Sequence, residues 1–205
     1  MTEPPRLRAV AVADPPELWR DLGFTVSGAV ATVGTVAVHL GSPGAGITGW
    51  RVDGLPETAD LDGLPVPAGV ADDAAVDRGG HPNGVATIDH LVVVTPDLHR
   101  TAARIEDAGV ALRRIRRAGG DPPREQAFFR LGEVILEVAG PAQGGGEGPA
   151  RLWGLAFDCV DLDTAVAVLG DRVGPPREAV QSGRRIATLR REAGSSVPMA
   201  FMGPA

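Results

Sequence analysis

This chain of 205 residues contains one cysteine, no tyrosine and, among its 20 basic residues, no lysine. A single cysteine excludes a disulfide bond within the chain. Cys159 lies among apolar strand residues, so we predict that it is a core thiol. A reduced cytosol agrees with this composition but is not required by it. The missing lysine and tyrosine indicate a compositional bias of the genome, and we draw no function from them.

A basic excess and long apolar runs are also missing. The net charge is −6 and the sequence pI is about 5.2, whereas a nucleic-acid surface needs clustered Arg or Lys on a basic background. We therefore expect no nucleic-acid partner. The sequence offers neither a signal-peptide core nor a run long enough for a membrane helix. We expect a cytoplasmic protein with no membrane partner, and its 43% of hydrophobic residues is ample for a core.

One local basic run departs from this acidic background. It consists of Arg113, Arg114, Arg116 and Arg117. A solvated strand end or turn is the favoured interpretation, ahead of a clamp for phosphate or carboxylate groups.

What the chain does contain is an internal repeat. The segment TIDHLVVVTPDL (87–98) recurs in outline as RLWGLAFDCVDL (151–162), and VILEVAGP (134–141) recurs as VPMAFMGP (197–204). The offset between the copies is 64 residues at the start and 63 at the end. A fixed period of this kind indicates supersecondary units that bury their apolar faces against one another.

Each copy predicts the element order β-α-β-β-β. The first copy predicts strands at 87–94, 110–116, 125–131 and 133–139, with a helix that begins at the N-cap Thr95 and Pro96 and ends near Ala108. The second predicts strands at 151–158, 173–178, 184–191 and 196–202, with a helix at 162–169. The Gly-rich stretch 144–148 between them predicts a flexible connector.

The N-terminal region carries a compressed third version. It predicts a strand at 7–12, a helix from an N-cap at Asp14 to Gly23, strands at 24–27, 29–33 and 35–40, and the opening strand of a truncated fourth unit at 47–53. We therefore predict two domains, a degenerate βαβββ domain at 1–80 and a tandem domain at 86–205 with units 86–141 and 150–204.

Tandem units with His in the first strand and Glu in the last resemble the vicinal oxygen chelate superfamily, which includes glyoxalase I, extradiol dioxygenases, and fosfomycin and bleomycin resistance proteins. The segments that carry the resemblance are IDHLVV (88–93) and VILEVAGP (134–141). It covers residues 86–204 well and 6–53 loosely. The resemblance implies an α+β fold in which repeated βαβββ units pair into a curved, cup-forming mixed sheet with helices on the outer face and a divalent metal in the cup.

The resemblance implies four metal ligands, of which this chain keeps two. His90 and Glu137 stand at the first two positions, and the matched positions of the second unit are Gly154 and Ala200, which cannot bind a metal. Catalytic iron and zinc sites usually keep three protein ligands. We therefore expect either no metal or a weakly bound divalent ion. His81 is our candidate for a third ligand, although its His-Pro-Asn-Gly sequence is more typical of a turn.

Strand alternation predicts which side chains line the cup. Gln126, Phe128 and Arg130 share one face of their strand, and the other, more apolar face should lie under the helix. We predict a polar cluster of His90, Glu137, Gln126 and Arg130, with Phe128 as an aromatic wall. A buried ion pair of His90 with Glu137, balanced by Arg130, is an alternative of equal weight to metal binding.

The second unit should supply a different wall. Alternation predicts that its contribution to the substrate site includes Gly154, Arg184 and Ala200. Because Gly and Ala replace two large ligands, we predict an asymmetric cup, polar on the side of the first unit and apolar with spare volume on the side of the second.

Two functions remain open. The leading one is a glyoxalase-like small-molecule enzyme with an incomplete metal site, in which Glu137 acts as base or metal ligand and Arg130 or Arg184 holds an anionic oxygen. The other is a non-catalytic small-molecule-binding or drug-sequestering protein of the same fold. A third ligand converging on His90 and Glu137 would favour the enzyme, and an open apolar cleft without one would favour the binding protein. The sequence leaves the substrate, the metal and the oligomeric state open.

Overall fold

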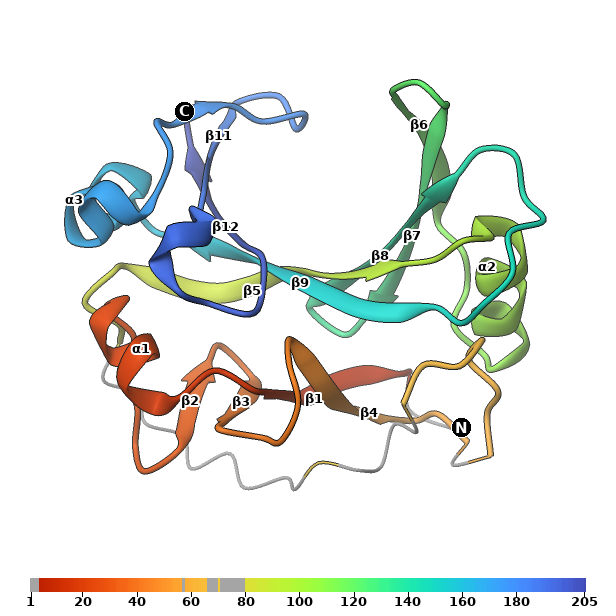
Figure 1. Ribbon diagram of the computed structural model, residues 1–205, viewed down its shortest axis with the longest axis horizontal. Coiled ribbons are helices and arrows are strands. Elements are labelled where there is room, and N and C mark those ends of the chain that lie inside the picture. Colours follow the sequence, from red (N-terminus) through yellow and green to blue (C-terminus); the bar gives the residue numbers. More distant parts are fainter. Residues whose placement is uncertain (1–3, 57, 66–69, 71–79) are drawn as a thin grey trace.

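The computed structural model describes residues 4–56, 58–65, 70 and 80–205, which form two stacked sheets (Figure 1). The smaller sheet has the strand order β2-β3-β1-β4 and the larger one the order β10-β11-β12-β9-β5-β8-β7-β6. The smaller sheet and its helix comprise β1 (Arg6–Val12), α1 (Pro16–Asp21), β2 (Val30–Val33), β3 (Val36–Leu40) and β4 (Ile47–Asp53). The rest comprises β5 (Val85–Val94), α2 (Leu98–Asp107), β6 (Arg114–Gly119), β7 (Arg124–Leu131), β8 (Val134–Pro141), β9 (Arg151–Cys159), α3 (Leu162–Leu169), β10 (Arg177–Glu178), β11 (Arg184–Thr188) and β12 (Met199–Pro204), with two short 3-10 helices, Gly170–Arg172 and Arg191–Ala193.

The two repeated units pair to form the larger sheet. β5 lies at its centre, parallel to β8 of its own unit and antiparallel to β9, which opens the second unit. β9 in turn pairs in parallel with β12. The sheet curls so that β6 and β7 rise on one side of its concave face and β11 on the other, with α2 and α3 outside (Figure 1). The predicted α+β fold, a cup-forming mixed sheet of βαβββ units, is confirmed.

The apolar stripes and N-caps of the helices outside the cup determine which face of each helix is buried and where it begins. On α2 the buried residues include Leu98, Ala102 and Ile105, as the sequence predicts. The predicted cap at Thr95 is wrong, because the carboxylate of Asp97 accepts the backbone N–H of Arg100 at 3.0 Å and the helix begins only at Leu98. None of the described helices is long and apolar enough to cross a membrane.

The smaller sheet covers the convex face of the larger one, so that both share one core (Figure 1). Trp19 and Phe24 lie 4.6 Å apart between ring centroids, and Phe24 packs 5.2 Å from Phe157 of β9, which stacks on Phe201 of β12 at 5.6 Å. Cys159 is buried beside this cluster, and burial raises the pKa of its thiol to about 12. The prediction of a core thiol is confirmed.

The smaller sheet repeats part of the strand pattern of the larger one. β1 pairs in parallel with β3 and antiparallel with β4, as β5 does with β8 and β9. The predicted strand at 24–27 is wrong, because Ser27 makes only an isolated bridge to Val30.

The predicted helix cap at Asp14 is also wrong. The N-cap of α1 is Pro15, which has no side-chain cap. Asp14 is buried, and its carboxylate instead accepts the hydroxyl of Ser195 at 2.5 Å and the backbone N–H of Ser196 at 2.7 Å. The N-terminal part of the chain is thereby tied to the segment that precedes β12.

Candidate functional site

The floor of the cup brings His90 and Glu137 together. His90 is on β5 and Glu137 on β8, neighbouring parallel strands, and both side chains are on the concave face. The His90 Nε2 lies 3.5 Å from the Glu137 Oε2. Both side chains are more than four-fifths buried, so the pair lies at the bottom of the cup and not at its rim.

Asp89 is a member of the site that sequence analysis missed. Its carboxylate lies 2.6 Å from the His90 Nδ1 and accepts a hydrogen bond from the Arg184 Nη1 at 2.8 Å. Simple alternation would place Asp89 and His90 on opposite faces. The register between β5 and β9 shifts between Ile88 and His90, and such a bulge leaves Asp89 outside the regular alternation. No feature of the sequence marks this bulge.

The Asp89 carboxylate lies between two cationic or proton-donating groups. Burial alone would raise its pKa, but the hydrogen bonds with His90 and Arg184 outweigh burial and hold the pKa of Asp89 below its usual value of 3.8. Asp89 is therefore ionised at neutral pH. A carboxylate accepts, so it holds the proton of the imidazole on Nδ1 and leaves Nε2 turned toward Glu137.

A chain of hydrogen bonds extends from this centre to both walls. On the first wall, the Gln126 amide donates to the Glu137 Oε1, and the Arg116 Nε donates to the Gln126 Oε1 at 3.1 Å. On the second wall, Arg184 donates to Asp158 and, at 3.0 Å, to Gln181. The buried polar groups at the centre of the cup are thus partnered, as burial requires.

An aromatic ring and two further guanidinium groups complete the first wall. Phe128 is opposite Glu137 in the register of β7 and β8. The Arg114 guanidinium lies 4.7 Å from its ring centroid and that of Arg116 lies 5.6 Å from it. Within the described residues Arg114 makes no ion pair, so its charge is available to a ligand.

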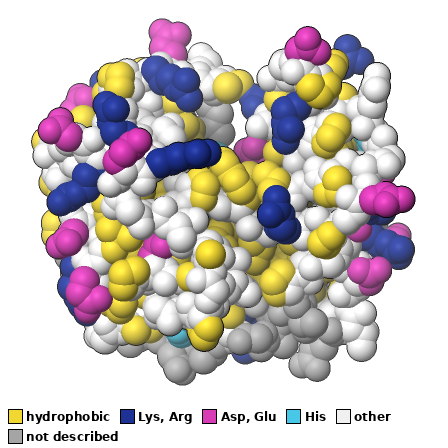
Figure 2. Space-filling model, viewed as in Figure 1, with side chains coloured by type: hydrophobic (Ala, Val, Ile, Leu, Met, Phe, Trp, Pro, Cys, Tyr) yellow, Lys and Arg dark blue, Asp and Glu magenta, His cyan; other side chains and the backbone are white. Residues whose placement is uncertain are grey.

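The space above this floor is a cavity of about 120 Å³. Figure 2 shows its mouth as a notch between two lobes of the molecule. Its floor is polar, with His90 and Glu137, and the side of the second unit is largely apolar, with Ile186, Met202 and Val180. The cavity is smaller than the roughly 300 Å³ at the low end of ordinary ligand pockets, so it holds one end of a small molecule.

Three predicted site residues lie where the sequence places them. Gln126 and Phe128 are on the concave face beside Glu137, and Arg184 reaches the same floor from β11. Ala200 is on the strand next to Arg184, opposite Thr188, and is half-buried.

Arg130 does not belong to this cluster. It is on the same face of β7 as Phe128, but at the end of the strand, and its Nη1 donates to the Glu133 carbonyl oxygen at 2.8 Å. Alternation fixes the face of a side chain but not its height along the strand. Arg130 is therefore outside the cup and lines a different cavity.

His81 also lies away from His90 and Glu137. Its Nδ1 accepts the backbone N–H of Thr25 at 3.0 Å, and its ring packs 5.3 Å from that of Phe24. The interpretation as a turn residue holds, since the backbone N–H of Gly84 bonds the His81 carbonyl at 2.8 Å.

Gly154 leaves no spare volume. A Cβ atom at this position would lie 2.7 Å from the carbonyl oxygen of Pro198, which already accepts the N–H of Leu155 at 3.0 Å. The segment before β12 thus occupies the place where a third ligand would stand. The spare volume predicted at Gly154 is wrong, and the apolar wall consists of side chains higher in the cup.

A divalent metal does not fit the residues that converge here. Only the His90 Nε2 and the Glu137 Oε2 face one point, and Asp89 binds the opposite ring nitrogen. No three His, Cys, Asp or Glu side chains within the described ranges come together as a metal site. Catalytic sites usually supply three protein ligands, so we derive no step through a metal.

Solved structures match part of the chain at low sequence identity. No protein-family model and no curated protein sequence matches the chain. The match to methylmalonyl-CoA epimerase from Mycobacterium tuberculosis covers 60% of this chain and 90% of the epimerase chain, at 18% identity and a TM-score of 0.48. The match to a single-residue variant of the Streptomyces coelicolor methylmalonyl-CoA epimerase, in complex with 2-nitronate-propionyl-CoA, covers 58% of this chain and 96% of that chain, at 20% identity and a TM-score of 0.46. The match to a hypothetical protein from Bacillus halodurans covers 58% of this chain and 94% of that chain, at 14% identity and a TM-score of 0.47.

These values are too low to carry an argument about function. The paired βαβββ arrangement itself, with β5 beside β9 at the centre of one curved sheet, is the fold that the resemblance to the vicinal oxygen chelate superfamily implies.

Proposed function

We propose that the protein is a small-molecule enzyme of the vicinal oxygen chelate type that moves a proton on an anionic substrate without a firmly bound metal. The observation that carries the proposal is the row Asp89, His90 and Glu137 at the floor of a cavity. Each member is oriented by a neighbour, as general acid–base residues must be.

In this proposal Glu137 is the base. Gln126 holds its Oε1, so its Oε2 is the oxygen left to accept a proton from a carbon of the substrate. The C–H bond breaks, the proton forms an O–H bond on Glu137, and the electron pair stays on the substrate as an enolate. The proton then passes from the Glu137 Oε2 to the His90 Nε2, which carries no proton of its own because Asp89 holds the imidazole proton on Nδ1, and His90 returns it to the carbon. Arg114 and Arg116 bind the anionic group at the mouth.

The size of the cavity limits the substrate. About 120 Å³ admits the reacting end of a small carboxylate or thioester, and the rest of the molecule extends through the mouth. The apolar wall from Ile186 and Met202 favours a reacting carbon that carries a small alkyl group.

A specific observation also favours the second candidate, a non-catalytic binding protein. The polar groups of the floor already satisfy one another without a ligand, and no third metal ligand converges among the described residues. Such a cup binds the same small anion and leaves it unchanged.

Deuterium exchange distinguishes the two candidates. The purified protein is incubated in D₂O with 2-oxo acids, malonates and their thioesters, and loss of the C–H signal is followed by proton NMR with and without EDTA. We expect exchange that EDTA does not abolish and that falls at least ~10²-fold in Glu137→Gln, the usual size of a general-base contribution. Glu147→Gln, an exposed glutamate of the 144–148 segment, is the matched control and should exchange normally.

Two other outcomes would contradict the proposed metal-independent acid–base enzyme. Saturable binding of a probe without exchange would assign the cup to the binding protein. Exchange that EDTA abolishes would restore a metal site and contradict the acid–base mechanism.

A further inference from the structure

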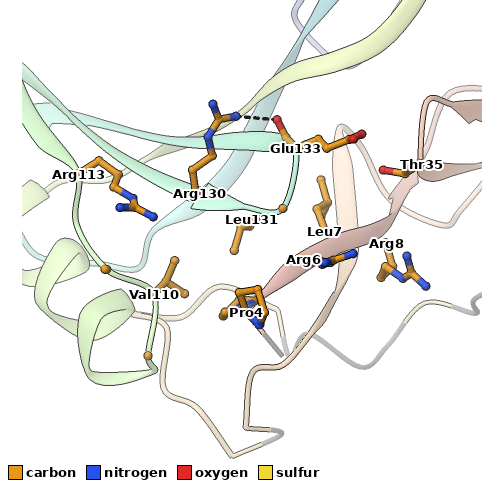
Figure 3. Close-up of a pocket in the computed structure, with 14 residues that line it drawn as sticks. Pro4, Arg6, Leu7, Arg8, Thr35, Val110, Arg113, Arg130, Leu131 and Glu133 are labelled. Carbon is orange, nitrogen blue, oxygen red and sulfur yellow. Dashed lines mark hydrogen bonds between the residues drawn. The ribbon is translucent and has the colours of Figure 1, made fainter. Parts of the chain in front are cut away.

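A larger cavity lies at the junction of the two sheets, away from the cup. It has a volume of about 650 Å³ and is lined by residues of four separate segments: residues 4–8, Thr35, residues 109–111 with Arg113, and residues 130–133. In Figure 3, Arg6 and Arg8 of β1 lie on one side, Arg113 and Arg130 on the other, and Leu7, Val110 and Leu131 between them. Its volume is in the range of roughly 300–1,000 Å³ that is usual for small-molecule sites.

The charge of this cavity is positive in a protein whose net charge is −6. Four arginines line it, with Glu133 as its one acidic residue. The charge of Arg8 is neutralised by an ion pair, because its Nε lies 3.1 Å from the Asp53 Oδ2. Arg6 and Arg113 make no ion pair in the part of the chain that the structure describes.

The positions of these arginines are partly fixed by the fold. The aliphatic part of Arg6 packs over Gly132, whose missing Cβ would lie 3.1 Å from the Arg6 Cγ. The backbone N–H of Arg113 bonds the Phe128 carbonyl at 2.8 Å, which sets Arg113 beside the strand of Arg130. Arg130 uses Nη1 on the Glu133 carbonyl and keeps its other N–H groups for a ligand.

We propose that this junction cavity binds a small phosphorylated molecule, with its phosphate groups between Arg6, Arg113 and Arg130 and its organic part on the apolar floor. A guanidinium offers paired N–H donors that match two phosphate oxygens, and several guanidinium groups around one pocket favour a diphosphate over a single carboxylate. The cavity is separate from the cup, so the proposal does not depend on the acid–base function.

Binding here would bridge both sheets of the molecule. Arg6 is on β1 of the smaller sheet, whereas Arg113 and Arg130 belong to the first unit of the larger one. A ligand that binds the folded junction but not the unfolded chain stabilises the fold by RT ln(1 + L/Kd), where L is the free ligand concentration.

Inorganic pyrophosphate is the probe, measured by titration calorimetry and by thermal unfolding of the full chain in 150 mM NaCl. We expect saturable binding of one pyrophosphate per chain with a rise in Tm. The Kd should increase at least tenfold in Arg113→Ala and in Arg6→Ala and only several-fold in Arg113→Lys, which keeps the charge but loses the paired donors. Arg191→Ala, an exposed arginine outside the cavity, should bind as the unaltered protein does.

Three results would overturn the proposal. One is a Kd for pyrophosphate no lower than that for sulfate. Another is a Kd for citrate equal to that for pyrophosphate, which would indicate a polycarboxylate site. The third is unchanged binding in both Arg113→Ala and Arg6→Ala when their circular dichroism and ligand-free Tm match those of the unaltered protein.

Discussion

At the scale of single residues, Asp89 joins the two repeated units at the floor of the cup. Its carboxylate is hydrogen-bonded to His90 of its own strand and to Arg184 of β11 in the second unit. Its side chain is 13% exposed, so water screens these contacts little. Removing one partner from a buried charged network leaves the others without compensation and is costly.

Asp89→Asn tests this role through pH. The folded-state pKa of Asp89 is lowered, so its stabilising contribution is present above the ordinary value of 3.8 and is lost as pH falls through the lower folded value. We expect the variant to be about 1.5–3 kcal/mol less stable at pH 7, the range for hydrogen bonds to charged groups, and the difference to shrink as pH falls below 3.8. Urea denaturation at pH 7, 4 and 2 measures this.

Asp163→Asn is the control for that series. Asp163 pairs with Arg185 on the surface and its side chain is 67% exposed, so its loss should cost less than about 1 kcal/mol. A stability difference for Asp89→Asn that stays constant down to pH 2 would contradict the role of its charge.

The residues of the cup show how far alternation predicts a site. Alternation places Glu137, Gln126 and Phe128 together because each lies inside a regular stretch of strand. It also places His90 with them, although the register of β5 shifts just before this residue. Asp89 was missed because a bulge depends on the pairing with β9, which a local pattern does not encode.

At the scale of elements, the segment before β12 is part of the cup. It places the Pro198 carbonyl against Gly154, where β9 opens the second unit. Glycine at this position therefore reflects the approach of backbone and not an empty pocket.

Gly154→Ala is expected to destabilise the protein by about 1–3 kcal/mol, the usual cost of overpacking, because its Cβ would meet the Pro198 oxygen at 2.7 Å. Gly174→Ala is the matched control, since its Cβ would lie 3.8 Å from the nearest atom, the Thr188 oxygen. Chemical denaturation compares the two variants. Equal stability of both would show that the segment before β12 moves aside freely.

Element boundaries were predicted best where strands are long and buried. The prediction 162–169 for α3 is identical to the structure, and 151–158 for β9 falls one residue short. The prediction of a short strand near 173–178 holds only for its last two residues, because β10 is Arg177–Glu178 at the edge of the sheet. Short edge strands depend on one neighbour, so their pattern carries little information.

The connector between the units was also predicted incompletely. Arg100 of α2 donates to the carbonyl oxygens of Gly146 and Gly148 at 2.8 and 2.7 Å, and the Gly145 N–H bonds Asp97. These contacts hold the glycine-rich stretch against the helix, although its composition alone predicts a free linker.

At the scale of the whole molecule, the smaller sheet closes the core of the larger one. Trp19 is fully buried between the two sheets, in contact with Phe24 and Phe157. Because most core residues form one cluster that spans both sheets, we expect the chain to unfold as one unit.

Trp19→Ala should lower the free energy of unfolding by about 3–5 kcal/mol, the usual cost of deleting a large buried aromatic side chain. Trp153→Ala removes the same side chain from a position that is 47% exposed, so its effect should be much smaller. Calorimetry and circular dichroism at two wavelengths measure both variants. Two separate transitions in Trp19→Ala, with the larger sheet at its original Tm, would show that the sheets are independently stable.

The bond between Asp14 and the two serines before β12 also sets a condition on when the protein can fold. Asp14 is 181 and 182 residues away from Ser195 and Ser196. While the chain is being synthesised, the Asp14 carboxylate beside Trp19 lacks these partners until Ser195 and Ser196 have left the ribosome. The core beside Trp19 is therefore completed only after the second repeated unit has been made.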